Sequence, residues 1–286
     1  MSKKLFLDLG RQPIANRFIR HKNREEFFFD LRVVFDEETK LVSLEKFVDL
    51  SLMFNDEYVY LSSASKTMRE HFKKTALQFQ REFKPWSVLE IGSNDGVFLK
   101  NFTNKTAYSV EPCGNFAEIT RSLGYKTYSS FWNIDLAREI IQEHGKTELI
   151  FSANCMCHIP EIDNAFQAIS NCLTDEGVFI FEDPSLLEML KRNSYDQIYD
   201  EHAHIFSVTA LKNKLNQAGL DIFRVEKLSV HGGSNRIYVK KLSSNRKVEN
   251  SVNESLAEES NFGIGELSTY EEFAARVHKS KDELLE

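Results

Sequence analysis

The chain has 286 residues, a length that allows one large domain or two of ordinary size. Hydrophobic residues make up 42% of it and charged residues 28%, which excludes a disordered or fibrous chain. The formal charge is −7 and no basic block is present, so neither nucleic acid nor an anionic membrane is an expected partner.

The N-terminal stretch lacks the long apolar core of a signal peptide, and no apolar run approaches the roughly 20 residues that cross a bilayer. The four cysteines lie in segments expected to be buried, and they lack the paired spacing of a zinc site. They are Cys113, Cys155, Cys157 and Cys172. We therefore expect a cytoplasmic protein with free thiols.

Residues 1–86 are a mixed segment, too short and irregular for a second large core, and we expect a small α+β cap that covers the substrate. From Ser87 onward, short apolar runs alternate with amphipathic segments. Strands are predicted at 87–91, 107–111, 126–129, 148–153 and 177–182, and helices at 96–102, 115–123, 134–145 and 161–173. This alternation indicates βαβ units and a parallel sheet covered on both faces.

Two further apolar runs, at 220–229 and 235–243, are joined by the short sequence VHGGS and predict an antiparallel hairpin. Residues 87–242 are therefore expected to form one Rossmann-like α/β domain with a mostly parallel, seven-stranded sheet. Residues 243–286 complete the chain. Within them, 243–261 has the polar composition of a linker, and 270–286 has the pattern of an amphipathic helix.

The turn after the first predicted strand carries two glycines and reads EIGSNDG from Glu90 to Gly96. Glycines let the backbone approach a ligand, and the helix that follows offers free N–H groups. Glu111 ends the second strand, where a carboxylate can accept hydrogen bonds from ribose hydroxyls. The spacing GxxxG, without the third glycine of the dinucleotide pattern, suits S-adenosylmethionine better than NAD. The alternative is an ordinary tight turn with a solvated Glu111.

A second candidate site follows the strand at 177–182, in the insertion Tyr199-Asp200-Glu201-His202-Ala203-His204. This insertion opens at the carboxyl end of the sheet, where ligands bind in open α/β folds. A histidine beside a carboxylate and a phenol is a base suited to neutral pH. The alternative is a polar surface loop. Two close histidines also suggest a metal, but the sequence offers no identifiable third ligand, and we expect none.

Several motifs together resemble one enzyme family. They are LDLGRQPIANRF (7–18), YVYLSS (58–63), EIGSNDGVFL (90–99), IYDEHAHIFS (198–207) and HGGSNRIYV (231–239). Their sequences and order resemble those of S-adenosylmethionine-dependent nucleotide-sugar C-methyltransferases, the 3-C-methyltransferases of deoxysugar biosynthesis. The resemblance runs from about Leu7 to Lys241. It implies a class I methyltransferase fold, S-adenosyl-L-methionine as cofactor and a nucleotide sugar, for a surface polysaccharide or a glycosylated metabolite, as substrate.

In such enzymes a 4-keto sugar nucleotide loses the proton at C3, and the enolate attacks the methyl group of the sulfonium. The resemblance implies that His202 is the general base, with Glu201 and Tyr199 orienting it or stabilising the enolate. It assigns Tyr60 to the substrate. It assigns the cofactor to Glu90, Gly92, Asn94, Gly96, Glu111, Pro112, Phe131, Trp132 and Asn154. It assigns His158, His231 and Arg236 to the substrate pocket.

The chain departs from the family pattern in three places. The family usually carries an N-terminal zinc-binding segment with paired cysteines, but no cysteine precedes Cys113, so we expect no structural zinc there. Asp200 stands where the family commonly has a histidine. The family usually continues into a C-terminal domain that helps to bind the nucleotide sugar, and we expect most of it to be missing here. Without zinc, the N-terminal region is expected either to be looser or to be held by four aromatic residues, which are Phe27, Phe28, Phe29 and Phe35.

Three other functions remain open from the sequence. His202 would serve equally well in a sugar or small-molecule O-methyltransferase, where it would deprotonate a hydroxyl. A methyltransferase fold without its substrate-binding domain could instead bind a partner without catalysis, and a dinucleotide oxidoreductase is the remaining alternative. The sequence does not reveal the sugar, the nucleotide or the oligomeric state.

Overall fold

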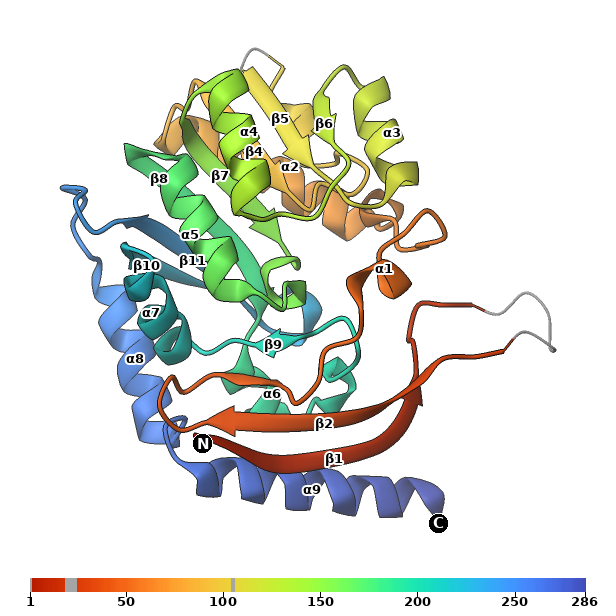
Figure 1. The fold of residues 1–286 in the computed structure, drawn as a ribbon. Coiled ribbons are helices and arrows are strands. Elements are labelled where there is room, and N and C mark those ends of the chain that lie inside the picture. Colours follow the sequence, from red (N-terminus) through yellow and green to blue (C-terminus); the bar gives the residue numbers. More distant parts are fainter. Residues whose placement is uncertain (1, 19–24, 104–105) are drawn as a thin grey trace.

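The computed structural model describes residues 2–18, 25–103 and 106–286, and its centre is a seven-stranded sheet (Figure 1). The strands are β4 (Ser87–Ile91), β5 (Thr106–Val110), β6 (Lys126–Tyr128), β7 (Thr147–Ala153), β8 (Leu173–Pro184), β10 (Leu220–Leu228) and β11 (Ser234–Lys241). Their order is β10-β11-β8-β7-β4-β5-β6. Strands β4 to β8 pair in parallel, whereas β11 is antiparallel to both of its neighbours. The mostly parallel sheet and its closing hairpin are confirmed.

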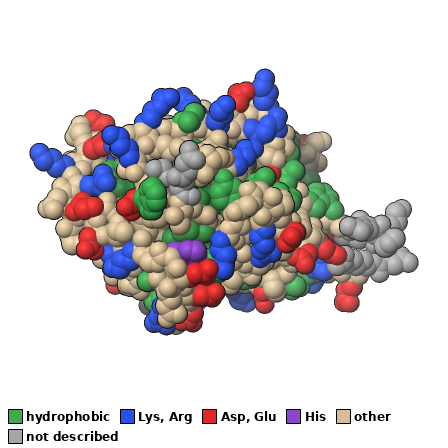
Figure 2. All heavy atoms as spheres, turned by 90° about the horizontal axis from the view of Figure 1, so that it is seen from above, with side chains coloured by type: hydrophobic (Ala, Val, Ile, Leu, Met, Phe, Trp, Pro, Cys, Tyr) green, Lys and Arg blue, Asp and Glu red, His purple; other side chains and the backbone are tan. Residues whose placement is uncertain are grey.

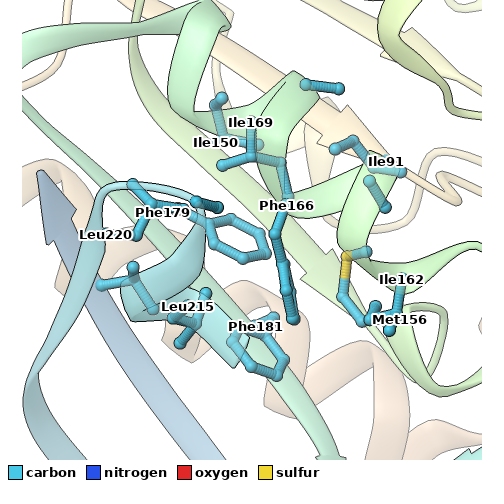
Figure 3. Close-up of a cluster of buried hydrophobic side chains, with 14 of the residues drawn as sticks. Ile91, Ile150, Met156, Ile162, Phe166, Ile169, Phe179, Phe181, Leu215 and Leu220 are labelled. Atoms are coloured by element: carbon cyan, nitrogen blue, oxygen red, sulfur yellow. The ribbon is translucent and has the colours of Figure 1, made fainter. Parts of the chain in front are cut away.

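Helices cover both faces of this sheet because its strands present apolar side chains alternately to the two sides. In β7, Ile150 packs into one layer, and Leu149 and Phe151 pack into the other. The first layer contains α4 (Ile134–His144), α5 (Ile162–Cys172) and α7 (Val208–Gln217), and the second contains α2 (Lys66–Glu82). Figure 3 shows the core of the first layer, where Phe166 of α5 lies beside Phe179 and other aromatic and aliphatic side chains.

The N-terminal segment forms a second, four-stranded sheet with its own core. This sheet has the order β1-β2-β3-β9. The strands are β1 (Lys3–Pro13), β2 (Phe28–Asp36), β3 (Val42–Leu44) and β9 (His204–Ile205). Two helices, α6 (Leu186–Arg192) and α9 (Leu267–Leu285), pack on it, and α9 runs along β1 in Figure 1. Because β9 belongs to the insertion after β8, the cap sheet is joined directly to the candidate site.

Three further helices belong to the fold. The helices are α1 (Leu50–Met53), α3 (Gly114–Ser122) and α8 (Asn250–Phe262). Helix α8 corrects the expectation of a linker at 243–261. Its buried face is largely polar, since Ser255 and Glu259 are 8% and 1% exposed, so the sequence shows little apolar periodicity there. The helix expected at 96–102 is also wrong, because only a short 3-10 turn forms at Leu99–Asn101.

The aromatic residues expected to hold the N-terminal region differ in burial. Phe35 is fully buried and stacks on Tyr270 of α9, with ring centroids 4.4 Å apart. Phe29 packs at the edge of the same core. Phe27 and Phe28 are each 40% exposed, so they contribute little to it. The cap is held by Phe35 and by α9, a helix more than 200 residues further along the chain.

No helix in the described part of the chain is long and apolar enough to cross a membrane. Figure 2 shows basic and acidic side chains interspersed on the face seen from above, with apolar side chains between them. This mixture is what a net charge of −7 distributed over 79 charged side chains (36 basic plus 43 acidic) produces.

Candidate active site

A cavity of about 470 Å³ lies at the carboxyl ends of β4, β5, β7 and β8, beneath residues of the N-terminal segment. Most of the predicted site residues line it. These are Tyr60, Gly92, Asn94, Glu111, Pro112, Phe131, Trp132, Asn154, His158, Tyr199, Glu201, His202 and His231. Glu90, Gly96 and Arg236 lie outside this lining. The structure therefore brings residues from the cap, the sheet edge and the insertion after β8 into one cavity.

The turn after β4 is tied to the end of β5. Gly92 has φ 73°, and a Cβ there would lie 2.7 Å from Cys155 Sγ, so this position requires glycine. The backbone N–H of Asn94 donates to Glu111 Oε2 (2.7 Å), and that of Cys113 donates to Oε1 (2.9 Å). Burial raises the pKa of Glu111, although these two N–H groups oppose the shift. The carboxylate is thus fixed at the cavity wall.

Glu90 and Gly96 shape this turn from behind. Glu90 is 4% exposed, and its pKa is well above the ordinary range because of burial and the nearby charge of Asp95. Gly96 has φ 71°, and a Cβ there would lie 3.2 Å from side-chain atoms of Thr120 and Leu123. Neither residue reaches the cavity, so we assign them a structural role in placing Gly92 and Asn94.

An apolar wall and a polar edge flank this turn. Trp132 is 5% exposed, and its Nε1 donates to the carbonyl oxygen of Ala165 (3.1 Å), which fixes the indole beside Phe131. Asn154 follows β7 in the left-handed conformation, φ 49°, and its backbone N–H donates to the carbonyl oxygen of Glu182 (2.6 Å). The neighbouring strand β8 therefore orients Asn154.

His202 also lines the cavity, as a neutral proton acceptor. Its Nδ1 is 2.6 Å from the carbonyl oxygen of Gln197. Since a carbonyl only accepts, Nδ1 carries the proton and Nε2 keeps a free lone pair. The ring lies 4.3 Å from that of Tyr199 and 5.3 Å from that of His158. Burial lowers the pKa of His202 to about 4, so the imidazole is uncharged near pH 7.

Two consecutive carboxylates hold the N-terminal segment over the cavity. Glu201 accepts hydrogen bonds from Asn16 Nδ2 (2.5 Å) and from the Tyr58 hydroxyl (3.0 Å). Asp200 Oδ1 accepts from the backbone N–H of Ala15 (3.0 Å). Sequence reasoning did not assign Asn16 or Tyr58, although both stand inside motifs that carried the resemblance. That coincidence was the signal that could have identified them.

The other two predicted histidines of the cavity are His158 and His231, which come from different elements. His158 stacks on Phe54, with ring centroids 5.2 Å apart, and its Nε2 has no hydrogen-bond partner among the described residues. His231 has φ 50°, and its carbonyl oxygen accepts from Gln197 Nε2 (3.3 Å). Gln197 therefore connects the hairpin turn to His202, a role the sequence did not indicate.

Arg236 lies outside the cavity in a buried cluster of polar groups. It is 4% exposed, and its Nε donates to Glu182 Oε1 (2.8 Å). Its other nitrogens donate to Glu226, Gln78 and Thr75. All of its donor groups are directed into the protein interior. The geometry favours a structural role over the predicted contact with substrate.

One group of side chains in the described chain has the geometry to hold a metal ion. The ligand atoms of Cys157, His158 and His202 all lie within 4.8 Å of one another. Cys157 is 2% exposed and directly precedes His158, which lines the cavity. The chain thus places a thiol beside the two imidazoles of the candidate site.

Three known protein families match successive parts of the chain. Residues 62–225 match a methyltransferase domain, and residues 229–286 match a C-methyltransferase C-terminal domain. Residues 1–54 match a domain described as a putative zinc binding domain.

The residues present in that N-terminal segment do not fit a zinc ion. Residues 1–54 contain no cysteine, and their single histidine, His21, lies outside the described residues. In the described part of the segment, no group of His, Cys, Asp and Glu side chains converges as metal ligands would. Burial of Leu7, Val33 and Phe35 stabilises the cap instead.

The curated C-methyltransferase NovU of Streptomyces niveus is 30% identical over 287 residues, which cover 98% of this chain and 68% of that protein. The PH0226 protein of Pyrococcus horikoshii has a similar fold, with a TM-score of 0.50 at 14% identity over 64% of this chain and 94% of that one. An S-adenosylmethionine-dependent methyltransferase of Clostridium acetobutylicum gives a TM-score of 0.48 at 16% identity, over 60% and 92% of the two chains. The chain therefore belongs to the C-methyltransferase family, S-adenosylmethionine-dependent enzymes with the class I methyltransferase fold.

Proposed function

We propose that the protein methylates C3 of a 4-keto deoxysugar carried on a nucleoside diphosphate, with His202 as the general base. One observation carries this proposal. The hydrogen bond from His202 Nδ1 to the Gln197 carbonyl (2.6 Å) leaves Nε2 as a proton acceptor at the cavity. The 30% identity with a C-methyltransferase supports transfer to carbon. The sugar nucleotide and the role of each residue are our assignments.

Removal of a C–H proton beside a ketone by imidazole requires stabilisation of the developing oxyanion. Burial raises the pKa of Tyr199 far above its ordinary value, and it also raises the pKa of Tyr60. Both phenols therefore remain protonated and can donate to an enolate oxygen. Glu201 also lines the cavity, where its carboxylate accepts from Asn16 and Tyr58, and we assign it to holding the N-terminal segment over His202.

S-adenosylmethionine, when bound, supplies an electrophilic methyl group on its sulfonium. We assign Glu111 to the ribose hydroxyls and the wall of Phe131 and Trp132 to the adenine. Gly92 and Asn94 would line the path between them, with Pro112 beside Glu111 and Asn154 facing the reacting end. Methyl transfer depends mainly on alignment and on exclusion of water, which a cavity roofed by the N-terminal segment provides.

The charges of the cavity indicate which part of the substrate enters it. Among the described residues that line it, none is lysine or arginine, whereas Glu111, Asp196 and Glu201 are acidic. A diphosphate in this environment would lack the cationic partners that phosphate groups require. We infer that the keto sugar occupies the cavity and that the diphosphate extends beyond its mouth.

Incubation with methyl-labelled S-adenosylmethionine and a panel of 4-keto deoxysugar nucleotides tests the proposal. We expect transfer to one of them, with carbon NMR of the product showing the label bonded to C3. A label bonded to oxygen would instead establish the O-methyltransferase alternative. If no acceptor is methylated, calorimetric titration with S-adenosylmethionine alone distinguishes two explanations. Binding of the cofactor indicates an enzyme whose acceptor is absent from the panel, and no binding indicates a non-catalytic protein.

A further inference from the structure

Cys157, His158 and His202 form a ligand set that the sequence did not disclose. The sequence showed His202 and His204 two residues apart, but His204 is directed elsewhere, with its Nε2 3.1 Å from the Pro160 carbonyl. In the structure, the side chains that lie beside His202 are instead those of Cys157 and His158, which follow β7. All three ligand atoms lie within 4.8 Å of one another. A thiolate and two imidazoles are donors that bind zinc-class ions, whereas magnesium and calcium prefer oxygen ligands.

Two further contacts prepare these side chains for a metal. The Gln197 carbonyl binds the Nδ1 proton of His202, which is the outer hydrogen bond that commonly orients a metal-bound histidine. His158 Nε2 has no hydrogen-bond partner among the described residues, so a ligand there would satisfy an otherwise unpaired nitrogen. His202 is therefore held with its Nε2 lone pair available, and His158 offers an unpaired Nε2.

We propose that Cys157, His158 and His202 bind one zinc-class divalent ion, with the fourth position open to the cavity. Zinc bonds of about 2.0 Å to nitrogen and 2.3 Å to sulfur place ligand atoms about 3.5 Å apart, so side-chain shifts of about 1 Å close the present arrangement. On binding, the Cys157 S–H bond breaks, the proton leaves to solvent, and a metal–sulfur bond forms. The two imidazoles donate lone pairs without change of protonation.

Occupation of this site would remove the proton acceptor from His202. The same Nε2 lone pair cannot bind a metal and accept the C3 proton, so the ion and the proposed reaction exclude one another. This consequence rests on the proposed function, whereas metal binding itself does not. The two are therefore tested separately, by spectroscopy and by activity.

The binding test uses Co²⁺ as a spectroscopic probe on the full chain after treatment with a chelator. We expect one Co²⁺ per chain, visible bands of tetrahedral geometry and a thiolate-to-cobalt charge-transfer band, all displaced by Zn²⁺. Cys157→Ala should abolish the charge-transfer band and weaken binding at least tenfold. Cys172→Ala is the matched control, because Cys172 is equally buried but lies on α5 beside Thr147. Binding of Co²⁺ that is equal in both variants would overturn the site.

X-ray absorption of the zinc-loaded parent protein keeps the test independent of any variant. We expect one sulfur and two histidine nitrogens in the coordination shell, and a shell of oxygen atoms alone would refute the assignment.

For the activity test, stoichiometric Zn²⁺ should inhibit methyl transfer at least tenfold in the parent, with recovery on chelation. It should inhibit Cys157→Ala little. Activation by Zn²⁺ would contradict mutual exclusion while leaving the site itself intact.

Discussion

Replacement of Arg236 by methionine removes a guanidinium from the protein interior while keeping most of its apolar volume. The Arg236 side chain is 5% exposed and that of Glu182 is 1% exposed. The variant leaves the Glu182 carboxylate with the His71 imidazole, whose Nε2 is 2.6 Å away, as its remaining side-chain hydrogen-bond partner. Removal of one partner from a buried ion pair costs about 3–5 kcal/mol, and we expect about 3 kcal/mol because His71 still donates.

Urea unfolding followed by circular dichroism measures this loss. The matched control is Arg192→Met, which breaks an ion pair with Glu188 on the exposed surface of α6, where the Arg192 side chain is 58% exposed. Such a pair contributes about 0.3–0.5 kcal/mol. Unchanged stability of Arg236→Met, together with a raised KM for the sugar nucleotide, would refute the structural role and restore the substrate contact predicted from the sequence.

The loss should also depend on pH. Burial pushes the pKa of Glu182 upward, but the hydrogen bond from His71 and the charge of Arg236 outweigh it, so the pKa is below its ordinary value of 4.5. A depressed pKa stabilises the fold above the unfolded-state pKa, and this contribution disappears as pH falls through the folded-state pKa. The difference between the parent and Arg236→Met should therefore be largest near pH 7 and shrink below about pH 4.5.

Two other variants test single contacts. Glu259→Gln should lower the free energy of unfolding by about 1–2 kcal/mol, because the Glu259 carboxylate accepts hydrogen bonds from the N–H groups of Val208 and Thr209 at the start of α7. An equal loss in Glu258→Gln, a half-exposed neighbour, would contradict this. Tyr58→Phe should lower kcat about tenfold in steady-state assays, since Glu201 loses a hydrogen bond that it accepts as a charged group; an unchanged kcat would remove Tyr58 from the positioning of Glu201.

The central sheet was predictable because its strands are short apolar runs bounded by turn residues. The cap sheet was not, since β3 and β9 have only three and two residues and pair with each other across about 160 residues of sequence. Helix α8 escaped prediction for another reason. Its buried face carries the Glu259 carboxylate that caps α7, and periodicity rules recognise apolar faces only.

The candidate site was predictable where its residues follow strands, as Gly92, Glu111 and Asn154 do. Contacts between distant segments were not, and Glu201 with Asn16 is the clearest case, at a separation of 185 residues. For Arg236, the sequence suggested a role that the geometry does not favour. Its motif resembled a substrate-binding turn, but only the strand register reveals Glu182 directly opposite it on β8.

The proton that leaves C3 tests the role of His202 most directly. The 4-keto sugar nucleotide that serves as acceptor is incubated in deuterium oxide with S-adenosylhomocysteine, and proton NMR follows loss of the C3 signal. Because no methyl group is transferred, the rate reports proton removal alone. His204→Gln is the matched control, since His204 is also buried but lies outside the cavity. We predict exchange at C3 in the parent and in His204→Gln, and at least a hundredfold slower exchange in His202→Gln, the loss expected when a general base is removed. Exchange at the parent rate in a folded His202→Gln protein would contradict the account.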